Sequence, residues 1–364
     1  ELLVVDAPHA QIYDGPRIMY KSPERLLDRM ELKDLVESLR NFPGVTRKKS
    51  ISTVINFFPK QAHTKVLASY GEDAAVVENN GKLLLLAADG IMPALMRANP
   101  FFAGYYAVLV NIHDIAAMGG VPIAMLDILS VKDNRVCSQV MKGMESAVKK
   151  FGVPIIGGHT HPDCDYDAID VAIIGTAEVG QAIFSHTAKV GDDVIAGMDL
   201  DGYYPDALPY AWDTTSRKEA PILRRQMLIM NKIAKQGLVN SGKDISNPGT
   251  LGTLGMLLET SGKGAIVDVD RVPRPQGVDL AQWLKSYQGC GYVVTCDPSN
   301  SQKVLEMYAS VGVTAAVIGK ITEEQRLLVR QGDQSAVMFD FEKEIITGCK
   351  PSSTVGWESV ELGK

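Results

Sequence analysis

The stretch IHDIAAMGGVP, residues 112–122, places the charged pair His113 and Asp114 in the most apolar part of the chain. The preceding residues, FFAGYYAVLVN, are also apolar on almost every side, which predicts a long buried helix over about residues 102–118. A Gly-Gly pair and a proline end this helix. An ionised carboxylate in a buried helix needs a partner, so Asp114 is expected to face a metal ion or a backbone cap. Asn111, three residues earlier on the same face, could share that partner.

The segments around this helix predict a mixed sheet with helices on one face. Before it come the strand-like segments KVLAS, AAVVEN and KLLLLAAD, with an Asn-Asn-Gly turn that predicts a hairpin between the last two. After it come the strand IAMLDILSV, a helix over about 135–151, the short strand VPIIGG and the strand AIDVAIIGTAEV. This order of elements is typical of an α+β or mixed α/β fold.

The chain length of 364 residues favours two domains. A fresh strand in KVGDDVIAG, after a Gly-Asp turn, places the domain boundary near Gly180. We therefore expect an extension at 1–30, a first domain over 31–180, a second domain over 181–347 and a tail over 348–364. Near the start of the first domain the pattern predicts helices from residue 31 and over about 51–58. In the second domain it predicts a helix over about 224–236.

Composition narrows the class of function. Hydrophobic residues make up 46% of the chain and charged residues 22%, as in ordinary globular proteins. The formal charge of −6 disfavours a nucleic-acid surface. Apolar runs such as LLLLAA are far shorter than the ~20 residues that a membrane helix requires. Small-molecule chemistry is therefore expected. Five scattered cysteines suit a reducing compartment, so we expect a cytoplasmic protein.

Four aspartates stand beside glycine or at the ends of predicted elements: Asp73, Asp89, Asp114 and Asp244. A hard cation such as Mg²⁺ prefers oxygen ligands, and it commonly bridges a few carboxylates to nucleotide phosphates. The alternative for Asp73 and Asp244 is a turn or helix-capping role, and Asp89 could simply close a strand.

Two further stretches contain candidate phosphate ligands. In IIGGHTHPDCD, residues 155–165, paired glycines after a strand let the backbone approach a phosphate closely. The same stretch invites a zinc interpretation, but its spacing matches no structural zinc pattern. In TRKKS, Arg47, Lys48 and Lys49 could supply positive charge to a reacting phosphate, with Lys48 and Lys49 as the candidate catalytic residues; a solvated basic turn is the alternative.

Taken together, these stretches resemble the aminoimidazole ribonucleotide (AIR) synthetase-related superfamily, which includes thiamine-phosphate kinase, selenophosphate synthetase and the hydrogenase maturation protein HypE. GEDAAVV resembles the family's Gly-x-Asp-Ala-Ala segment, and AADGIMP followed by NPF resembles the Thr-Thr-Asp segment of selenophosphate synthetase. NIHDIAAMGGVP, GGHT and DISNPGTLGTLGMLL follow in the family's order.

The resemblance implies a two-domain PurM-like fold that dimerises through strands of the first domain and binds ATP with Mg²⁺ in a cleft of aspartates. It implies that the metal ligands are Asp73, Asp89, Asp114 and Asp244, and that the nucleotide contacts are Asn111, Gly157, Gly158, His159 and Thr160. We expect His159 to contact a phosphate, because Mg²⁺ prefers oxygen ligands; a local capping role is the alternative.

The departures from the family pattern concern the acceptor of the phosphoryl group. No cysteine precedes Cys137, whereas selenophosphate synthetases carry a reactive Cys or Sec near their N-terminus. His159 replaces the loop aspartate of thiamine-phosphate kinases. What remains resembles the selenophosphate-synthetase-like proteins named methanogenesis marker 2. We expect ATP- and Mg²⁺-dependent phosphoryl transfer to an unidentified small molecule; the alternatives are a non-catalytic nucleotide-binding assembly or regulatory protein and a thiamine-phosphate kinase-like enzyme.

Overall fold

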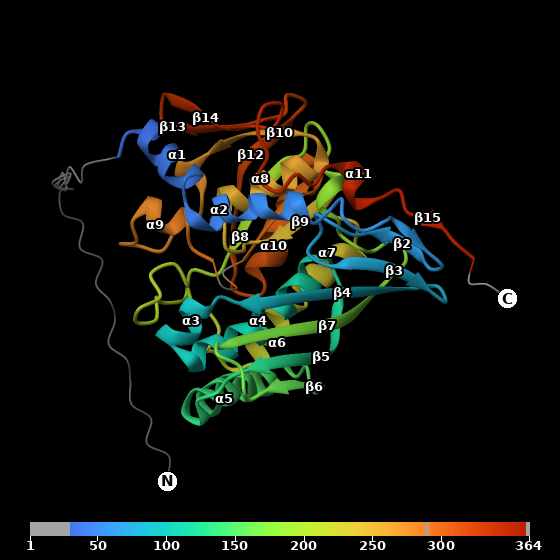
Figure 1. Ribbon diagram of the computed structural model, residues 1–364. Helices are drawn as coiled ribbons and strands as arrows, with labels where there is room; N and C mark the ends of the chain where they lie inside the picture. The colour runs from blue at the N-terminus through green and yellow to red at the C-terminus, as the bar shows by residue number, and fades with distance from the viewer. Residues whose placement is uncertain (1–29, 288, 290, 362–364) are drawn as a thin grey trace, which may run out of the picture. The chain divides into compact units, whose positions relative to one another are not determined.

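The structure, a computed structural model, describes residues 30–287, 289 and 291–361. The extension expected at 1–30 therefore lies outside the described residues except for Met30. The body that starts at Leu32 contains a six-stranded and a seven-stranded β-sheet with helices packed on them (Figure 1). This mixture of sheets and helices confirms the predicted α/β (α+β) fold class.

The six-stranded sheet has the strand order β2-β3-β4-β7-β5-β6. Neighbouring strands are antiparallel except β5 and β6, which are parallel. The strands are β2 (Lys65–Ala68), β3 (Ala75–Asn79), β4 (Lys82–Ile91), β7 (Ala168–Glu178), β5 (Val121–Ser130) and β6 (Ile155–His161). β3 and β4 form the predicted hairpin, and its two loop residues, Asn80 and Gly81, have φ angles of 51° and 77°. Positive φ at both positions is typical of a tight two-residue hairpin turn.

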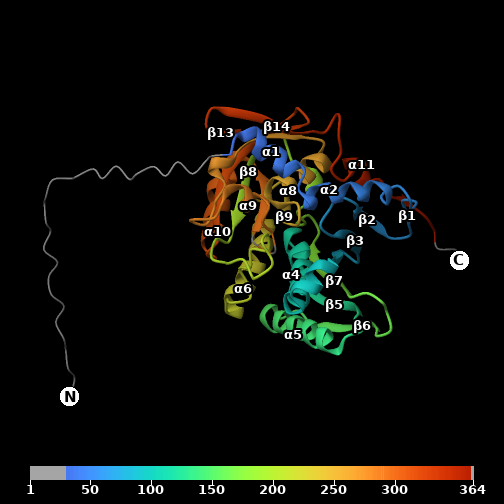
Figure 2. The same ribbon diagram turned by 60° about the vertical axis from the view of Figure 1, so that its left-hand side comes forward.

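Two long helices, α4 (Pro100–Ala117) and α5 (Asn134–Phe151), cover one face of this sheet (Figure 2). Both confirm the predicted helices to within two residues. They cross at two glycines, because a Cβ atom on Gly104 would lie 2.0 Å from the Val140 carbonyl oxygen and one on Gly143 would lie 1.9 Å from that of Phe101. This close approach packs α4 firmly between α5 and the sheet. The short helix α3 (Pro93–Ala98) precedes α4.

The opposite face of the six-stranded sheet is apolar and exposed. Its side chains are between 44% and 70% exposed, and they belong to Leu86, Ile123, Leu126, Ile128 and Ile156. An exposed apolar surface of this extent is unusual on a monomer and is typical of a surface that binds another protein.

The seven-stranded sheet has the order β14-β13-β10-β12-β8-β11-β9. Neighbouring strands are antiparallel except β10 and β13. The strands are β14 (Gln334–Asp340), β13 (Arg326–Gln331), β10 (Gly264–Asp268), β12 (Thr314–Thr322), β8 (Asp193–Met198), β11 (Gly291–Cys296) and β9 (Ser241–Asp244).

Helices cover both faces of this second sheet. Successive side chains of a strand point to opposite faces, and in β8 Val194 and Ala196 pack in one apolar cluster while Ile195 packs in another. The first cluster includes α1 (Leu32–Arg40), α8 (Gly249–Ser261) and α9 (Leu280–Leu284), and the second includes α7 (Ile229–Lys235) and α10 (Pro298–Ala309). The helix predicted over 224–236 is wrong as one element, because α6 (Ala220–Met227) and α7 are separated at Leu228.

The segment before the first sheet also differs from its prediction. The helix expected over 51–58 is instead α2 (Pro43–Thr46) followed by the 3₁₀ helix η1 (Arg47–Thr53). The hydroxyls of Ser50, Ser52 and Thr53 each donate to the carbonyl oxygen three residues earlier, at 2.7–2.9 Å. Such local bonds compete with a regular α-helix.

A few short elements complete the described part of the chain. They are β1 (Gln61–Ala62), which pairs in parallel with β15 (Glu358–Ser359), the helix α11 (Pro351–Thr354), and the 3₁₀ turns η2 (Ser185–Thr187) and η3 (Val269–Arg271). Among the described helices, none combines the length and the apolar character needed to cross a membrane.

Candidate metal and nucleotide site

Three of the four predicted metal ligands meet between the two sheets. Asp73 lies just before β3, Asp114 in the last turn of α4, and Asp244 at the end of β9. One carboxylate oxygen from each lies within 4.8 Å of the other two. Within the described residues this is the only group of three or more side chains of metal-binding type at such short range. The geometry fits a cation that is bound by oxygen atoms.

Asp73 is held in this group by Lys243, the residue before Asp244. The Lys243 ammonium forms an ion pair with Asp73 and also donates to the Gly71 carbonyl oxygen at 3.3 Å. The backbone N–H of Asp244 donates to the other Asp73 oxygen at 3.2 Å. Burial disfavours a charged ammonium, but Asp73 and Glu72 outweigh it and raise the pKa of Lys243 above its usual range. Lys243 is therefore a permanent positive charge beside the carboxylates.

Asp114 and Asp244 are buried and lack such a partner. No hydrogen bond from another described residue reaches either carboxylate. Burial and the nearby Asp89 and Asp244 raise the pKa of Asp114 well above its usual range. Burial and Asp73 raise the pKa of Asp244 to about 8. Two buried carboxylates that repel each other favour a cation, which would let both ionise.

Asp89, the fourth predicted ligand, lies near this group but outside it. The side chain of Asn111 fixes its backbone: Asn111 Oδ1 accepts from the Asp89 N–H at 3.2 Å, and Asn111 Nδ2 donates to the Ala107 carbonyl oxygen at 2.8 Å. Both ends of the Asn111 amide are thus bound within the protein, and the residue positions Asp89. Burial raises the pKa of Asp89, while the charge of Lys48 lowers it.

A cavity of about 300 Å³ opens beside the carboxylates. Asp89 and Asp244 line it together with Lys48, which comes from η1. Burial lowers the pKa of Lys48, and Asp89 partly offsets this effect. The remaining polar lining includes Arg47, the first cation of the TRKKS stretch. It also includes residues that the sequence did not single out for a site: Ser50, His113, Ser246, Asn247 and Tyr287.

His113 forms part of the cavity wall, one residue before Asp114. Its ring stacks on Tyr292 with a centroid separation of 5.5 Å. Burial lowers its pKa to about 4, so the imidazole is neutral at physiological pH. His113 therefore adds no positive charge to the site.

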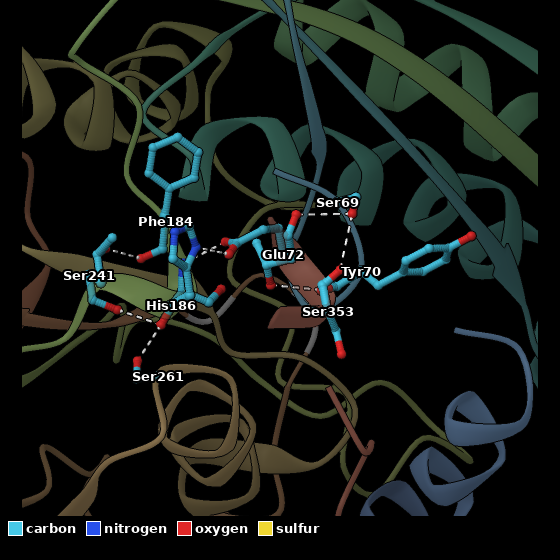
Figure 3. Close-up of polar contacts among 12 residues, drawn as sticks. Ser69, Tyr70, Glu72, Phe184, His186, Ser241, Ser261 and Ser353 are labelled. Atoms are coloured by element: carbon cyan, nitrogen blue, oxygen red, sulfur yellow. Dashed lines mark hydrogen bonds and ion pairs between the residues drawn. The ribbon is translucent and has the colours of Figure 1, made fainter. Parts of the chain in front are cut away.

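The loop before β3 is held by a second buried acid, Glu72 (Figure 3). Its carboxylate accepts from the Ser185 N–H at 2.5 Å and pairs with His186 Nδ1 at 2.7 Å. The Ser185 carbonyl oxygen in turn accepts from the hydroxyls of Ser241 and Ser261, at 3.0 and 2.7 Å. Glu72 thus ties the loop to the segment that leads into the second sheet.

Besides Asp73, Asp114 and Asn111, which lie behind the cavity wall or beside it, two further groups of predicted residues do not line the cavity. Gly157, Gly158, His159 and Thr160 belong to the exposed edge strand β6, so the loop predicted at these positions is corrected to a strand. Their contact with a nucleotide stays a prediction. Lys49 points away from Lys48, into a separate surface cleft with Lys350.

Besides the cavity-lining residues named above, sequence reasoning missed Lys243 and Glu72, which hold the loop of Asp73. A lysine in the short strand SGKD, directly before a predicted ligand, could have been found by asking which partner a buried ammonium would require. Glu72 likewise stands directly before a predicted ligand, Asp73, so the same question about its partner could have identified it.

Two family descriptions match this chain. "AIR synthase related protein, N-terminal domain" matches residues 71–179, and "AIR synthase related protein, C-terminal domain" matches residues 202–331. The chain belongs to the AIR synthase related family. The resemblance drawn from the sequence motifs is therefore confirmed at the level of the superfamily.

Similar proteins include uncharacterised proteins and a thiamine-monophosphate kinase. An uncharacterised protein of Methanocaldococcus jannaschii is 45% identical over 88% of this chain and all of its own length. An uncharacterised protein of Synechocystis is 35% identical over 87% of this chain and 98% of its own length. A thiamine-monophosphate kinase of Synechococcus elongatus is 25% identical over 74% of this chain and 88% of its own length.

Solved structures share the fold at low identity. Phosphoribosylformylglycinamidine synthase II of Thermotoga maritima has a TM-score of 0.70 at 18% identity over 88% of this chain, and this chain spans about half of that structure, 52%. A ThiL structure described as complexed with AMPPCP and TMP has a TM-score of 0.58 at 19% identity, over 74% of this chain and 91% of its own. A T. maritima PurL structure is described as complexed with ATP. These likenesses confirm the PurM-like fold.

Proposed function

We propose that this protein is an ATP- and Mg²⁺-dependent phosphotransferase that acts on a small molecule. The observation that carries the proposal is the meeting of the Asp73, Asp114 and Asp244 carboxylates within 4.8 Å of one another. Among the described residues, none donates a hydrogen bond to the buried carboxylates of Asp114 and Asp244. The nucleotide-bound PurL and ThiL structures with this fold support the choice of ATP.

In this proposal Asp73, Asp114 and Asp244 hold the metal ion, and Asp89 contributes from the cavity wall. The ion would neutralise charge on the phosphates, which is the main task in phosphoryl transfer. Lys48 is the catalytic cation that we propose, because it lines the same cavity as Asp89 and Asp244. We do not extend this role to Lys49, which lies in another cleft.

The metal assignment is tested by replacing the carboxylates one at a time. We expect Asp89→Asn and Asp114→Asn each to weaken Mg²⁺-ATP binding by at least about tenfold, since even the neighbours of metal ligands contribute 10–100-fold to affinity. Titration calorimetry measures the affinity, and Asp333→Asn, an exposed acid in the turn between β13 and β14, is the matched control. Unchanged Mg²⁺-ATP affinity in both folded variants would contradict the assignment of these aspartates to the metal site.

Turnover is tested separately from binding. ATP consumption in the presence of a metabolite extract, above a metal-free control, would establish an enzyme. Mg²⁺-ATP binding without such consumption would favour a nucleotide-binding assembly or regulatory protein. Thiamine monophosphate is the first defined acceptor to add, because a thiamine-monophosphate kinase is among the relatives.

A further inference from the structure

A segment that follows the second family match returns to the metal site. We name residues 346–360 the return segment; the second family match ends at residue 331. The return segment begins beside helix α8, where the carboxylate of Glu259 is buried. The Glu259 oxygens accept from the backbone N–H groups of Ile346, Thr347 and Gly348, at 2.8–3.1 Å. Its first residues are therefore firmly anchored.

Further along, the return segment bonds to the loop that carries Asp73. The Thr354 hydroxyl donates to the Tyr70 carbonyl oxygen at 2.8 Å, and the Ser69 hydroxyl donates to the Thr354 carbonyl oxygen at 3.1 Å. The indole N–H of Trp357 donates to the Ser69 hydroxyl at 3.1 Å. These three bonds join residues about 285 positions apart in the sequence.

The same loop is packed against the return segment at Gly71. This glycine has a φ of +102°, and a Cβ atom there would lie 3.0 Å from Cys349 Cβ. On its other side the loop is held by Glu72, bonded to Ser185 and His186, and by Asp73, bonded to Lys243. The loop is thus fixed between the second sheet and the return segment.

We infer that Thr354 is a positioning residue of the metal site: through its bond to Tyr70 it holds the loop that presents Asp73 to the metal ion. Thr354 is fully buried, at 0% exposure, and its hydroxyl donates its hydrogen bond to the Tyr70 carbonyl oxygen. A metal ligand must be held closely in place to contribute to affinity, and its supporting contacts do this. The inference rests on the proposed function, because it assigns Thr354 to that same site.

Two variants separate the hydroxyl from the bulk of the side chain. Thr354→Val keeps the shape and removes the donor, whereas Thr354→Ser keeps the donor. Ser359→Ala is the matched control in the same segment, because Ser359 is exposed and, among the described residues, its contact is the backbone pairing of β15 with β1. Trp357→Phe is a second variant that removes a different bond to the loop.

Two measurements are made on the full chain. Hydrogen exchange reports the backbone amides of residues 69–74 without any metal, and Mn²⁺ titration followed by electron paramagnetic resonance reports the metal affinity. In Thr354→Val we expect exchange about threefold to tenfold faster, as for the loss of one hydrogen bond. We expect its Mn²⁺ affinity to fall about tenfold. Thr354→Ser and Ser359→Ala should match the wild type in both.

The outcomes distinguish this inference from the proposed function. Unchanged exchange in Thr354→Val and Trp357→Phe overturns the inference, whatever the metal does. Faster exchange with unchanged Mn²⁺ affinity also overturns it and leaves the proposed function standing. A wild-type protein that binds no Mn²⁺ overturns the metal site, and the inference falls with it.

Discussion

Asp114 illustrates how burial turns a single carboxylate into a site. The side chain is 9% exposed in a helix whose other residues are almost entirely buried, and three acids surround it. Lys243 forms an ion pair with Asp73, whereas within the described part of the chain no lysine or arginine forms one with Asp114 or Asp244. The group as a whole therefore carries unbalanced negative charge when its carboxylates ionise, which favours the binding of a divalent cation.

This charge imbalance predicts an unusual pH dependence of stability. The pKa of Asp244 is about 8 in the folded protein and about 4 in an unfolded chain. The folded state then binds more protons, so the stabilisation is complete below pH 4 and is lost as the pH rises through 8. We expect the metal-free free energy of unfolding to fall between these values, by up to about 1.4 kcal/mol per pH unit.

Urea unfolding in EDTA across this pH range measures the slope. Asp244→Asn should flatten it, whereas Asp333→Asn should leave it unchanged. Mg²⁺ should stabilise the protein more at pH 8 than at pH 6, because it replaces the protons. A metal-free stability that rises steadily from pH 5 to pH 8 would contradict the assignment.

Helix α4 is the element that places Asp114, and its position depends on close packing. Gly104 of α4 and Gly143 of α5 allow each helix to approach the backbone of the other. Asn111, on the same helix, fixes Asp89 in β4. One helix thus positions two of the four predicted ligands, so its packing against α5 bears directly on the site.

We expect Gly143→Ala to destabilise the protein by about 1–3 kcal/mol, as for other overpacked cores. The added methyl group would lie 1.9 Å from the Phe101 carbonyl oxygen, and a backbone atom cannot move aside as a side chain end can. Chemical denaturation measures the loss. Lys142→Ala, on the exposed side of the same helix, is the control and should change stability by less than about 0.5 kcal/mol. Equal stabilities of the two variants would contradict this packing.

At the scale of the whole molecule, the outer face of the six-stranded sheet is the candidate interface with another chain. Its exposed side chains, defined above, form an apolar surface on the face turned away from α4 and α5. We propose that a second copy of the chain covers it, which accords with the dimer implied by the family resemblance. We also propose residues 31–180 and 181–347 as the two domains, since each range contains one of the two large sheets. Helix α1 is an exception, because it belongs to the first range but packs on the second sheet.

We expect the wild-type protein to be a dimer in light scattering at micromolar concentration, and Ile128→Glu to be a monomer. A charge in the centre of a buried apolar interface lacks a partner and costs several kcal/mol. Val337→Glu is the control, because Val337 is equally exposed but lies on β14 of the other sheet. A wild-type monomer, or a dimer in both variants, would contradict the proposed interface.

The sequence by itself determined the local elements and the residue types of the site. The long apolar run before Gly119 required a buried helix, and the turn Asn80-Gly81 required a tight hairpin, because both depend on neighbouring residues alone. Asp114 was expected to face a metal ion or a backbone cap because a charge within a buried helix needs a partner, and the family resemblance made it a metal ligand. The family motifs are short and follow one another in a fixed order, so they could be recognised from the sequence alone.

The tertiary structure alone decided which of these residues meet. Asp73 and Asp244 are about 170 positions apart and come together only because β9 lies beside the loop before β3. The choice of Lys48 over Lys49 follows from the 3₁₀ turn, which sends adjacent side chains into different clefts. The contact of Thr354 with Tyr70 likewise depends on how the return segment packs. Long-range contacts of this kind leave no local pattern in the sequence, because they are selected by packing and burial of the whole chain.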